Sequence, residues 1–222
     1  MNAESRVLLT MLKYRRMLLG ELLSLTGYSG EVVTHILERY SDAIRIQGEE
    51  VVASNPLLLA LKLLSMNVEL RKVSELLDWR DFEVFSSNLL SEAGYDVVHG
   101  LRITSPVRFE IDVFAVEPST GFSIAVDCKH WSSRSPSRLM EAATRHSERV
   151  SKMIKHYLLV RSKYKMAKNA KYVVPLVITL LTPTVRAHDG VLLLSIRELP
   201  HFLAEKYEII EYFEIKPIKI AS

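Results

Sequence analysis

Two acidic side chains interrupt strongly apolar strand-like segments, and they constrain the fold more than any other feature of the chain. Asp112 lies inside the segment 107–116, and Asp127 lies near the end of the segment 122–129. Side chains two apart on a strand point to the same face, so Asp127 and Lys129 should emerge together. A turn containing Pro and Gly joins the segments and should bring Asp112 beside them. Buried carboxylates are costly unless they are paired or bind a metal, so the pattern predicts a functional site.

The periodicity around this hairpin predicts an α/β fold with a mixed sheet flanked by helices. The expected order is helix, three strands, helix, two strands and a closing helix. The segments are a helix at 79–93 ended by Gly94, strands at 95–99, 107–116 and 122–129, a long helix at 137–160, strands at 172–181 and 191–196, and a helix at 197–205.

The first part of the chain predicts three helices followed by a hairpin. One helix covers residues 18–25, and the next begins after Ser29 and buries the face Val33, Ile36, Leu37 and Tyr40. Two short strands at 43–47 and 51–54 follow. This order resembles a small winged helix-turn-helix domain. Because residues 1–55 carry a net charge of −1, dimerisation or docking on the second domain is a hypothesis beside DNA binding.

We therefore expect three parts: a winged-helix-like domain at 1–54, a helical connector at 55–77 and a catalytic domain at 78–222. Asn55 caps an apolar helix at 56–66, and a helix that is apolar all round is buried on all sides. Its expected place is between the two domains or across a dimer interface.

Positive charge is concentrated in one segment. Residues 129–171 hold twelve Lys and Arg against Glu141 and Glu148, a net charge of +10 in a chain whose net charge is +3. This distribution is typical of a protein that binds a polyanion. At helical spacing, one stripe of the long helix should collect Arg138, Arg145, Arg149, Lys152, His156 and Lys163, and we expect it to contact DNA phosphates.

A single cysteine, Cys128, excludes an intramolecular disulfide and a multi-cysteine zinc site. It fits a reducing cytoplasm, and neither a targeting segment nor a membrane span is expected. The chain has one glutamine, Gln47, and scarcity of thermolabile amides is typical of thermophilic proteins.

The hairpin residues suit one kind of chemistry. Asp112, Asp127 and the backbone carbonyl of Cys128 offer the hard oxygen ligands that Mg²⁺ prefers. The ammonium group of Lys129 would hold the attacking water and steady a phosphate. Together they suit metal-assisted hydrolysis of a phosphodiester bond. The side chain of Cys128 should point the other way, into the core.

The Asp112 and Asp127-Cys128-Lys129 pattern resembles the PD-(D/E)XK nuclease superfamily. The helix before it, with Trp79, Phe82-Glu83, Leu89-Leu90 and Gly94-Tyr95, resembles the first core helix of Mrr-type restriction endonucleases and archaeal Holliday-junction resolvases. In those families a glutamate of this helix contributes to the metal site, and Glu83 matches it. The chain departs from the pattern where Ile111 replaces the proline before Asp112 and where Glu110 stands near a position that is often glycine.

The resemblance implies a DNA endonuclease that uses Mg²⁺ or Mn²⁺, with Glu83, Asp112, Asp127 and Lys129 as catalytic residues. His130 and Trp131 are further candidates for DNA contact. A homodimer is expected, because cleavage of two strands needs two active sites. One alternative is a catalytically silent DNA-binding or regulatory protein that keeps the fold. Another is an RNA nuclease of the tRNA-splicing type, which the paired carboxylates disfavour.

Overall fold

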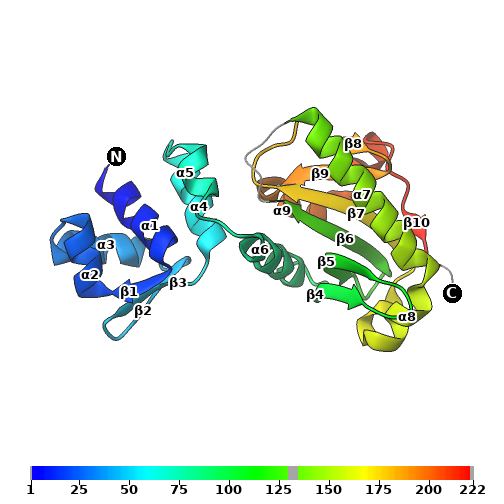
Figure 1. The fold of residues 1–222 in the computed structure, drawn as a ribbon, viewed down its shortest axis with the longest axis horizontal. Helices are drawn as coiled ribbons and strands as arrows, with labels where there is room; N and C mark the ends of the chain where they lie inside the picture. Colours follow the sequence, from blue (N-terminus) through cyan, green and yellow to red (C-terminus); the bar gives the residue numbers. More distant parts are fainter. Residues whose placement is uncertain (1, 130–134, 221–222) are drawn as a thin grey trace. The chain divides into compact units, whose positions relative to one another are not determined.

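A computed structural model describes residues 2–129 and 135–220 of the protein (Figure 1). By contacts within the chain, the protein divides into two compact units, Met1–Asp81 and Phe82–Ser222. The domain limits expected at 54/55 and 77/78 stay predictions.

The first unit contains five helices and a small antiparallel sheet. In chain order its elements are α1 (Ala3–Tyr14), β1 (Arg16–Leu18), α2 (Leu19–Thr26), α3 (Gly30–Arg39), β2 (Ile44–Gln47), β3 (Glu50–Ala53), α4 (Pro56–Ser65) and α5 (Leu70–Ser74). The strand order is β1-β3-β2. The predicted helices and hairpin are present, and the short strand β1 was not predicted. The assignment as a winged helix stays a prediction.

Helix α4 is the apolar helix expected at 56–66, and it packs against α1 within the first unit. The Asn55 side chain caps it as predicted, because its Oδ1 accepts a hydrogen bond of 3.1 Å from the backbone N–H of Leu58. The buried side chains of the helix are Leu57, Leu59, Ala60 and Leu63.

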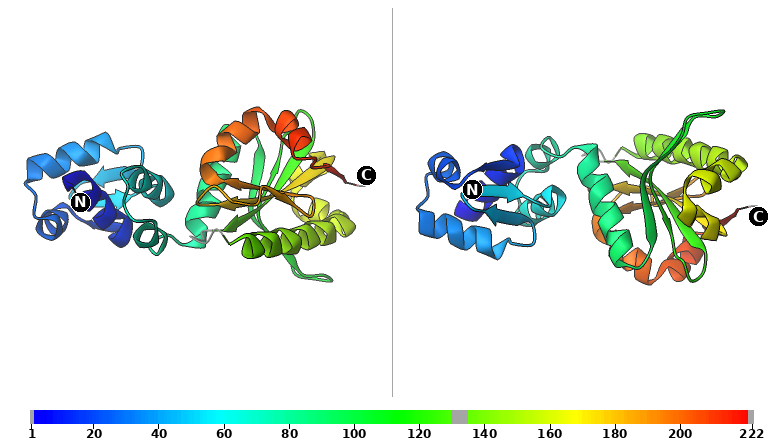
Figure 2. Two further views of the ribbon diagram at one scale, coloured as in Figure 1. Left: turned by 90° about the horizontal axis from the view of Figure 1, so that it is seen from above. Right: turned by 90° about the horizontal axis from the view of Figure 1, so that it is seen from below.

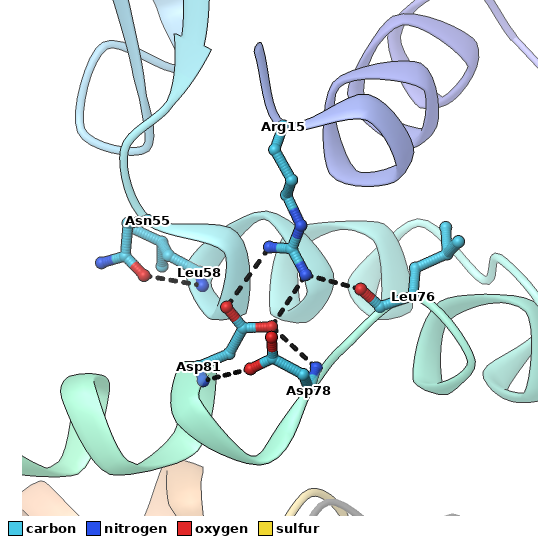
Figure 3. Close-up of polar contacts among 6 residues, drawn as sticks. All are labelled: Arg15, Asn55, Leu58, Leu76, Asp78 and Asp81. Atoms are coloured by element: carbon cyan, nitrogen blue, oxygen red, sulfur yellow. Dashed lines mark hydrogen bonds and ion pairs between the residues drawn. The ribbon is translucent and has the colours of Figure 1, made fainter.

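Arg15 ties the end of α1 to the start of α6 (Trp79–Glu92) (Figure 3). Its guanidinium donates to both carboxylate oxygens of Asp81, at 2.8 and 3.3 Å, and to the carbonyl oxygen of Leu76 at 2.6 Å. Asp78 and Asp81 also cap each other, since each carboxylate accepts from the other residue's backbone N–H. The first turn of α6 is therefore held by a charged network.

The second unit is built on a larger mixed sheet. After α6 its elements are β4 (Asp96–Ile103), β5 (Phe109–Val116), β6 (Phe122–Lys129), α7 (Pro136–Lys155), α8 (Tyr157–Lys163), η1 (Lys165–Asn169), β7 (Tyr172–Thr179), β8 (Ala187–His188), β9 (Val191–Ser195), η2 (Ile196–Glu198), α9 (Leu199–Ala204), α10 (Lys206–Tyr212) and β10 (Ile218–Lys219). The strand order is β4-β5-β6-β7-β9-β8, with β10 also paired to β7.

The sheet combines an antiparallel part and a parallel part. Strands β4, β5 and β6 form antiparallel pairs, whereas β6, β7 and β9 are parallel. Helix α7 covers one face of the sheet, and α9 and α10 lie on the other (Figure 2). Strand β7 is buried along almost its whole length, as a central parallel strand must be. This is the mixed α/β architecture expected from the sequence.

The prediction of one continuous helix over residues 137–160 is wrong. The segment 137–160 is divided, because α7 ends at Lys155 and α8 begins at Tyr157. Strands β8 and β10 and helix α10 were not predicted. Within the part of the chain that the structure describes, no helix combines the length and apolar character needed to cross a membrane.

Candidate active site

Asp112 and Asp127 lie next to each other on neighbouring strands. The antiparallel register pairs Val113 with Val126, so the next positions along the two strands are Asp112 and Asp127. The Oδ2 atom of Asp112 accepts a hydrogen bond of 2.8 Å from the backbone N–H of Cys128. This contact fixes one carboxylate beside the other.

Gly100 lies on the other side of Asp112. The β4–β5 register pairs His99 with Val113 and Leu101 with Ile111, which leaves Gly100 across from Asp112. Its φ angle of 63° falls in the left-handed region that favours glycine. The backbone of β4 therefore changes its course beside the acidic residue.

The buried Asp127 carboxylate is held between two cations. Its side chain is only 1% exposed, and the Lys129 ammonium lies 2.7 Å from its Oδ2 atom. The Arg149 guanidinium, from helix α7, donates to its Oδ1 atom. The sequence predicted that Lys129 would share a face with Asp127, but it assigned Arg149 only to the basic stripe.

The surroundings shift the pKa values of the two carboxylates in opposite directions. Burial, followed by the nearby charge of Asp127, raises the pKa of Asp112 despite the hydrogen bond from Cys128. Burial also opposes ionisation of Asp127, but His146, Lys129 and Arg149 outweigh it and hold the pKa of Asp127 below its usual range. Asp127 is therefore the carboxylate that stays ionised more readily.

His146 is a buried residue of α7 that the sequence analysis missed. Its Nε2 atom donates a hydrogen bond of 2.8 Å to the carbonyl oxygen of Ala125. Burial lowers the pKa of His146 to about 4, so the ring is neutral near pH 7. The charge that balances Asp127 at neutral pH therefore comes from Lys129 and Arg149.

Glu83 is buried in helix α6 and has a partner that was not predicted. Its Oε2 atom lies 2.7 Å from Nε2 of His99 in β4. The next turn of α6 approaches β6, because Ser86 Oγ lies 3.7 Å from Cys128 Sγ. The only signal in the sequence was a histidine at the end of the strand predicted at 95–99, and it was not used.

Cys128 marks the point around which the acidic residues gather. Burial raises the pKa of its thiol well above the usual value, and the negative charges of Asp112, Asp127 and Glu83 raise it further. The thiol is therefore unreactive, as its expected place in the core implies.

The donor atoms of this region fit a hard divalent cation. Asp112 and Asp127 are adjacent and supply carboxylate oxygens, which Mg²⁺ prefers over nitrogen or sulfur. Among residues 2–129 and 135–220, however, no three His, Cys, Asp or Glu side chains converge into a ready metal cluster. In this arrangement both oxygens of Asp127 are paired with cationic side chains.

A basic pocket of about 630 Å³ lies beside Lys129 and Arg149, the two cations that contact Asp127. It is lined by Lys129, Arg138, Glu141, Ala142, Arg145, Glu148 and Arg149. Lys152 is exposed further along α7, and Arg145 forms an i,i+4 ion pair with Glu141.

The basic stripe predicted for the long helix is shorter in the structure. Lys163 does not continue the stripe, because it belongs to α8 and its Nζ atom donates to the carbonyl oxygen of Arg102. His130 and Trp131 lie outside the described residues.

The mixed sheet flanked by helices agrees with the restriction-endonuclease-like fold that the sequence resemblance implies. Residues 70–171 match the family model Mrr_cat, described as restriction endonuclease. Over this segment the chain is therefore similar to restriction endonuclease domains of the Mrr type. The match includes Glu83, Asp112, Asp127 and Lys129.

Two solved structures are similar to the chain at low identity. Restriction endonuclease FokI shares 12% identity with a TM-score of 0.42, over 93% of this chain and 44% of that one. Protein VC1899 from Vibrio cholerae shares 12% identity with a TM-score of 0.38, over 96% of this chain and 52% of that one. The chain thus spans about half the length of these two proteins. No curated protein matches it.

Proposed function

We propose that the protein is a metal-dependent endonuclease that hydrolyses phosphodiester bonds of DNA. The observation that supports it best is the Asp112–Asp127 pair with the Lys129 ammonium 2.7 Å from Asp127, since Lys129 also lines a basic pocket. A surface that offers carboxylates to a cation and cations to phosphates suits hydrolysis of a polyanion.

In this proposal Asp112, Asp127 and the backbone carbonyl of Cys128 hold the metal ion, and Glu83 joins them from helix α6. A divalent ion bound there lowers the pKa of water and neutralises charge on the phosphate. Lys129 orients the attacking water and stabilises the negative charge that develops on the phosphoryl oxygens. The hydrogen bond from the Cys128 N–H keeps Asp112 oriented throughout.

The basic face of α7 supplies the contact with DNA. Arg138 and Arg145 line the pocket beside Lys129, and Lys152 extends the exposed charge along the helix. Such side chains neutralise phosphates without reading bases. Sequence preference would have to come from elsewhere.

A homodimer is part of the proposal, because cleavage of both strands needs two active sites. The first unit would contribute to dimerisation or docking, or would contact DNA as a winged helix. Its exposed α3 surface carries Glu31, His35, Glu38 and Arg39, and Arg39 is paired with Glu4. This mixed charge favours a protein contact. A reducing cytoplasm fits the single buried thiol of Cys128.

Cleavage of a DNA panel tests the proposal. Linear, nicked, flapped and four-way substrates are incubated with and without Mg²⁺ or Mn²⁺, beside a Lys129→Ala protein. Metal-dependent cleavage that the variant lacks supports an endonuclease. Binding of DNA without cleavage of any substrate would instead support a silent DNA-binding protein, and cleavage that needs no metal would contradict the proposed chemistry.

A further inference from the structure

Arg149 forms an ion pair with a carboxylate oxygen that is proposed as a metal ligand. Its guanidinium pairs with Oδ1 of Asp127, while Lys129 pairs with Oδ2. The Asp127 side chain is only 1% exposed, so its carboxylate oxygens are shielded from solvent. A metal ion that binds Asp127 would therefore compete with these two cations for the charge and the lone pairs of the carboxylate.

Arg149 is the cation that is better placed to leave. Lys129 lies in β6, two residues from Asp127, and its backbone is paired with Thr179 in the parallel ladder. Arg149 reaches Asp127 from another element through a long side chain, which is 34% exposed. Its buried Nε atom has no hydrogen-bond partner among the residues that the structure describes. The side chain also lines the basic pocket with Arg138 and Arg145.

We propose that Arg149 exchanges Asp127 for a DNA phosphate when a divalent ion binds. Without the ion, the guanidinium neutralises the buried carboxylate. With the ion bound, Asp127 no longer needs this charge, and Arg149 turns into the pocket, where it forms a bidentate contact with a phosphate. The inference rests on the proposed function, and it makes metal binding and DNA binding mutually favourable through one side chain.

Metal affinity gives the first test, and it requires no cleavage. Mn²⁺ is titrated calorimetrically into the full chain and into Arg149→Ala and Arg149→Gln, with folding checked by circular dichroism. Both variants should bind Mn²⁺ about tenfold more tightly, because a charge-assisted competitor has been removed. A purely structural role predicts the opposite sign, since Asp127 would lose its support. Unchanged or weaker Mn²⁺ binding in the glutamine variant overturns the exchange.

DNA affinity gives the second test. It is measured with and without Ca²⁺, a hard divalent cation that binds oxygen ligands. Ca²⁺ should tighten DNA binding by the parent protein more than by Arg149→Ala, because linkage between two ligands is reciprocal. Arg145→Ala is the matched control: it should weaken DNA binding with or without Ca²⁺ and leave Mn²⁺ affinity unchanged. If Arg145→Ala raised the Mn²⁺ affinity as much as the Arg149 variants do, the effect would come from general electrostatics and the exchange would be disproved. If the parent protein cleaves DNA but Arg149→Gln gives neither expected result, the exchange alone is disproved. If the parent protein binds no Mn²⁺, the proposed metal site is wrong as well.

Discussion

The carboxylate of Asp112 accepts a 2.8 Å hydrogen bond from the backbone N–H of Cys128, the residue between Asp127 and Lys129. One side chain of β5 is thereby tied to the centre of the Asp-Cys-Lys segment of β6. The contact fixes the relative placement of the two carboxylates before any ligand arrives. It also means that an amide at position 112 can keep the orientation while it removes the charge.

Charge and geometry at the acidic pair can therefore be separated by substitution. Asp112→Asn keeps an acceptor for the Cys128 N–H but removes a ligand charge, so Mn²⁺ affinity and cleavage should both fall. Lys129→Ala should reduce cleavage by about 100-fold or more while the protein still binds Mn²⁺, because lysine supplies no ligand atom. Calorimetry beside a cleavage assay measures both quantities. Parent-like cleavage by Lys129→Ala would show that the proposed site is wrong.

His146 should make the stability of the second unit depend on pH. Its pKa is about 4 in the folded protein because of burial, against an ordinary value of 6.5. The unfolded chain therefore takes up this proton first as the pH falls. The contribution of neutral His146 to the free energy of unfolding is fully present above pH 6.5. It is lost progressively toward pH 4, by an amount on the order of a few kcal/mol.

A glutamine at position 146 isolates this effect. His146→Gln can still donate to the carbonyl of Ala125 but cannot take up a proton. Urea unfolding at pH 7 and pH 5 should show a smaller loss of stability in the variant than in the parent. His35→Gln, at an exposed position of α3, is the control. The interpretation fails if both glutamine variants lose as much stability as the parent.

The basic face of α7 should determine the salt dependence of DNA binding. Arg145→Ala combined with Lys152→Ala should weaken binding on all sequences alike and should lower the slope of log K against log salt by roughly 0.9 for each lost phosphate contact. The control pair Lys216→Ala and Lys219→Ala removes the same charge from exposed positions in and beside β10. A parent-like slope in the α7 variant, measured by fluorescence titration, would exclude this helix from the DNA surface.

Arg15 should stabilise the first unit more than an exposed ion pair does. Arg15→Ala removes the contacts with Asp81 and Leu76, and a loss of about 1–3 kcal/mol is expected for hydrogen bonds to a charged group. Arg39→Ala removes the pair with Glu4, where the arginine side chain is 66% exposed, and should cost less than about 1 kcal/mol. Urea unfolding followed by circular dichroism compares the two. Equal costs would mean that the network drawn in Figure 3 adds little stability.

Local pattern determined much of the second unit. The apolar runs at residues 107–116 and 122–129 predicted two strands, and the parity of positions 127 and 129 predicted that Asp127 and Lys129 share a face. The structure has both strands and the contact between the two side chains. These features depend on neighbours in the chain and on one short turn, so the sequence contains the information for them.

Only the tertiary structure decided which distant groups meet. Arg149 and His146 reach β6 because α7 packs across the sheet at one particular angle, and Glu83 meets His99 because α6 lies against β4. The break at His156 likewise escaped prediction, since helical periodicity continues through it in the sequence. Periodicity tells which face of a helix is buried. It does not tell where along a sheet that face comes to rest, because that depends on how the side chains of several elements pack together.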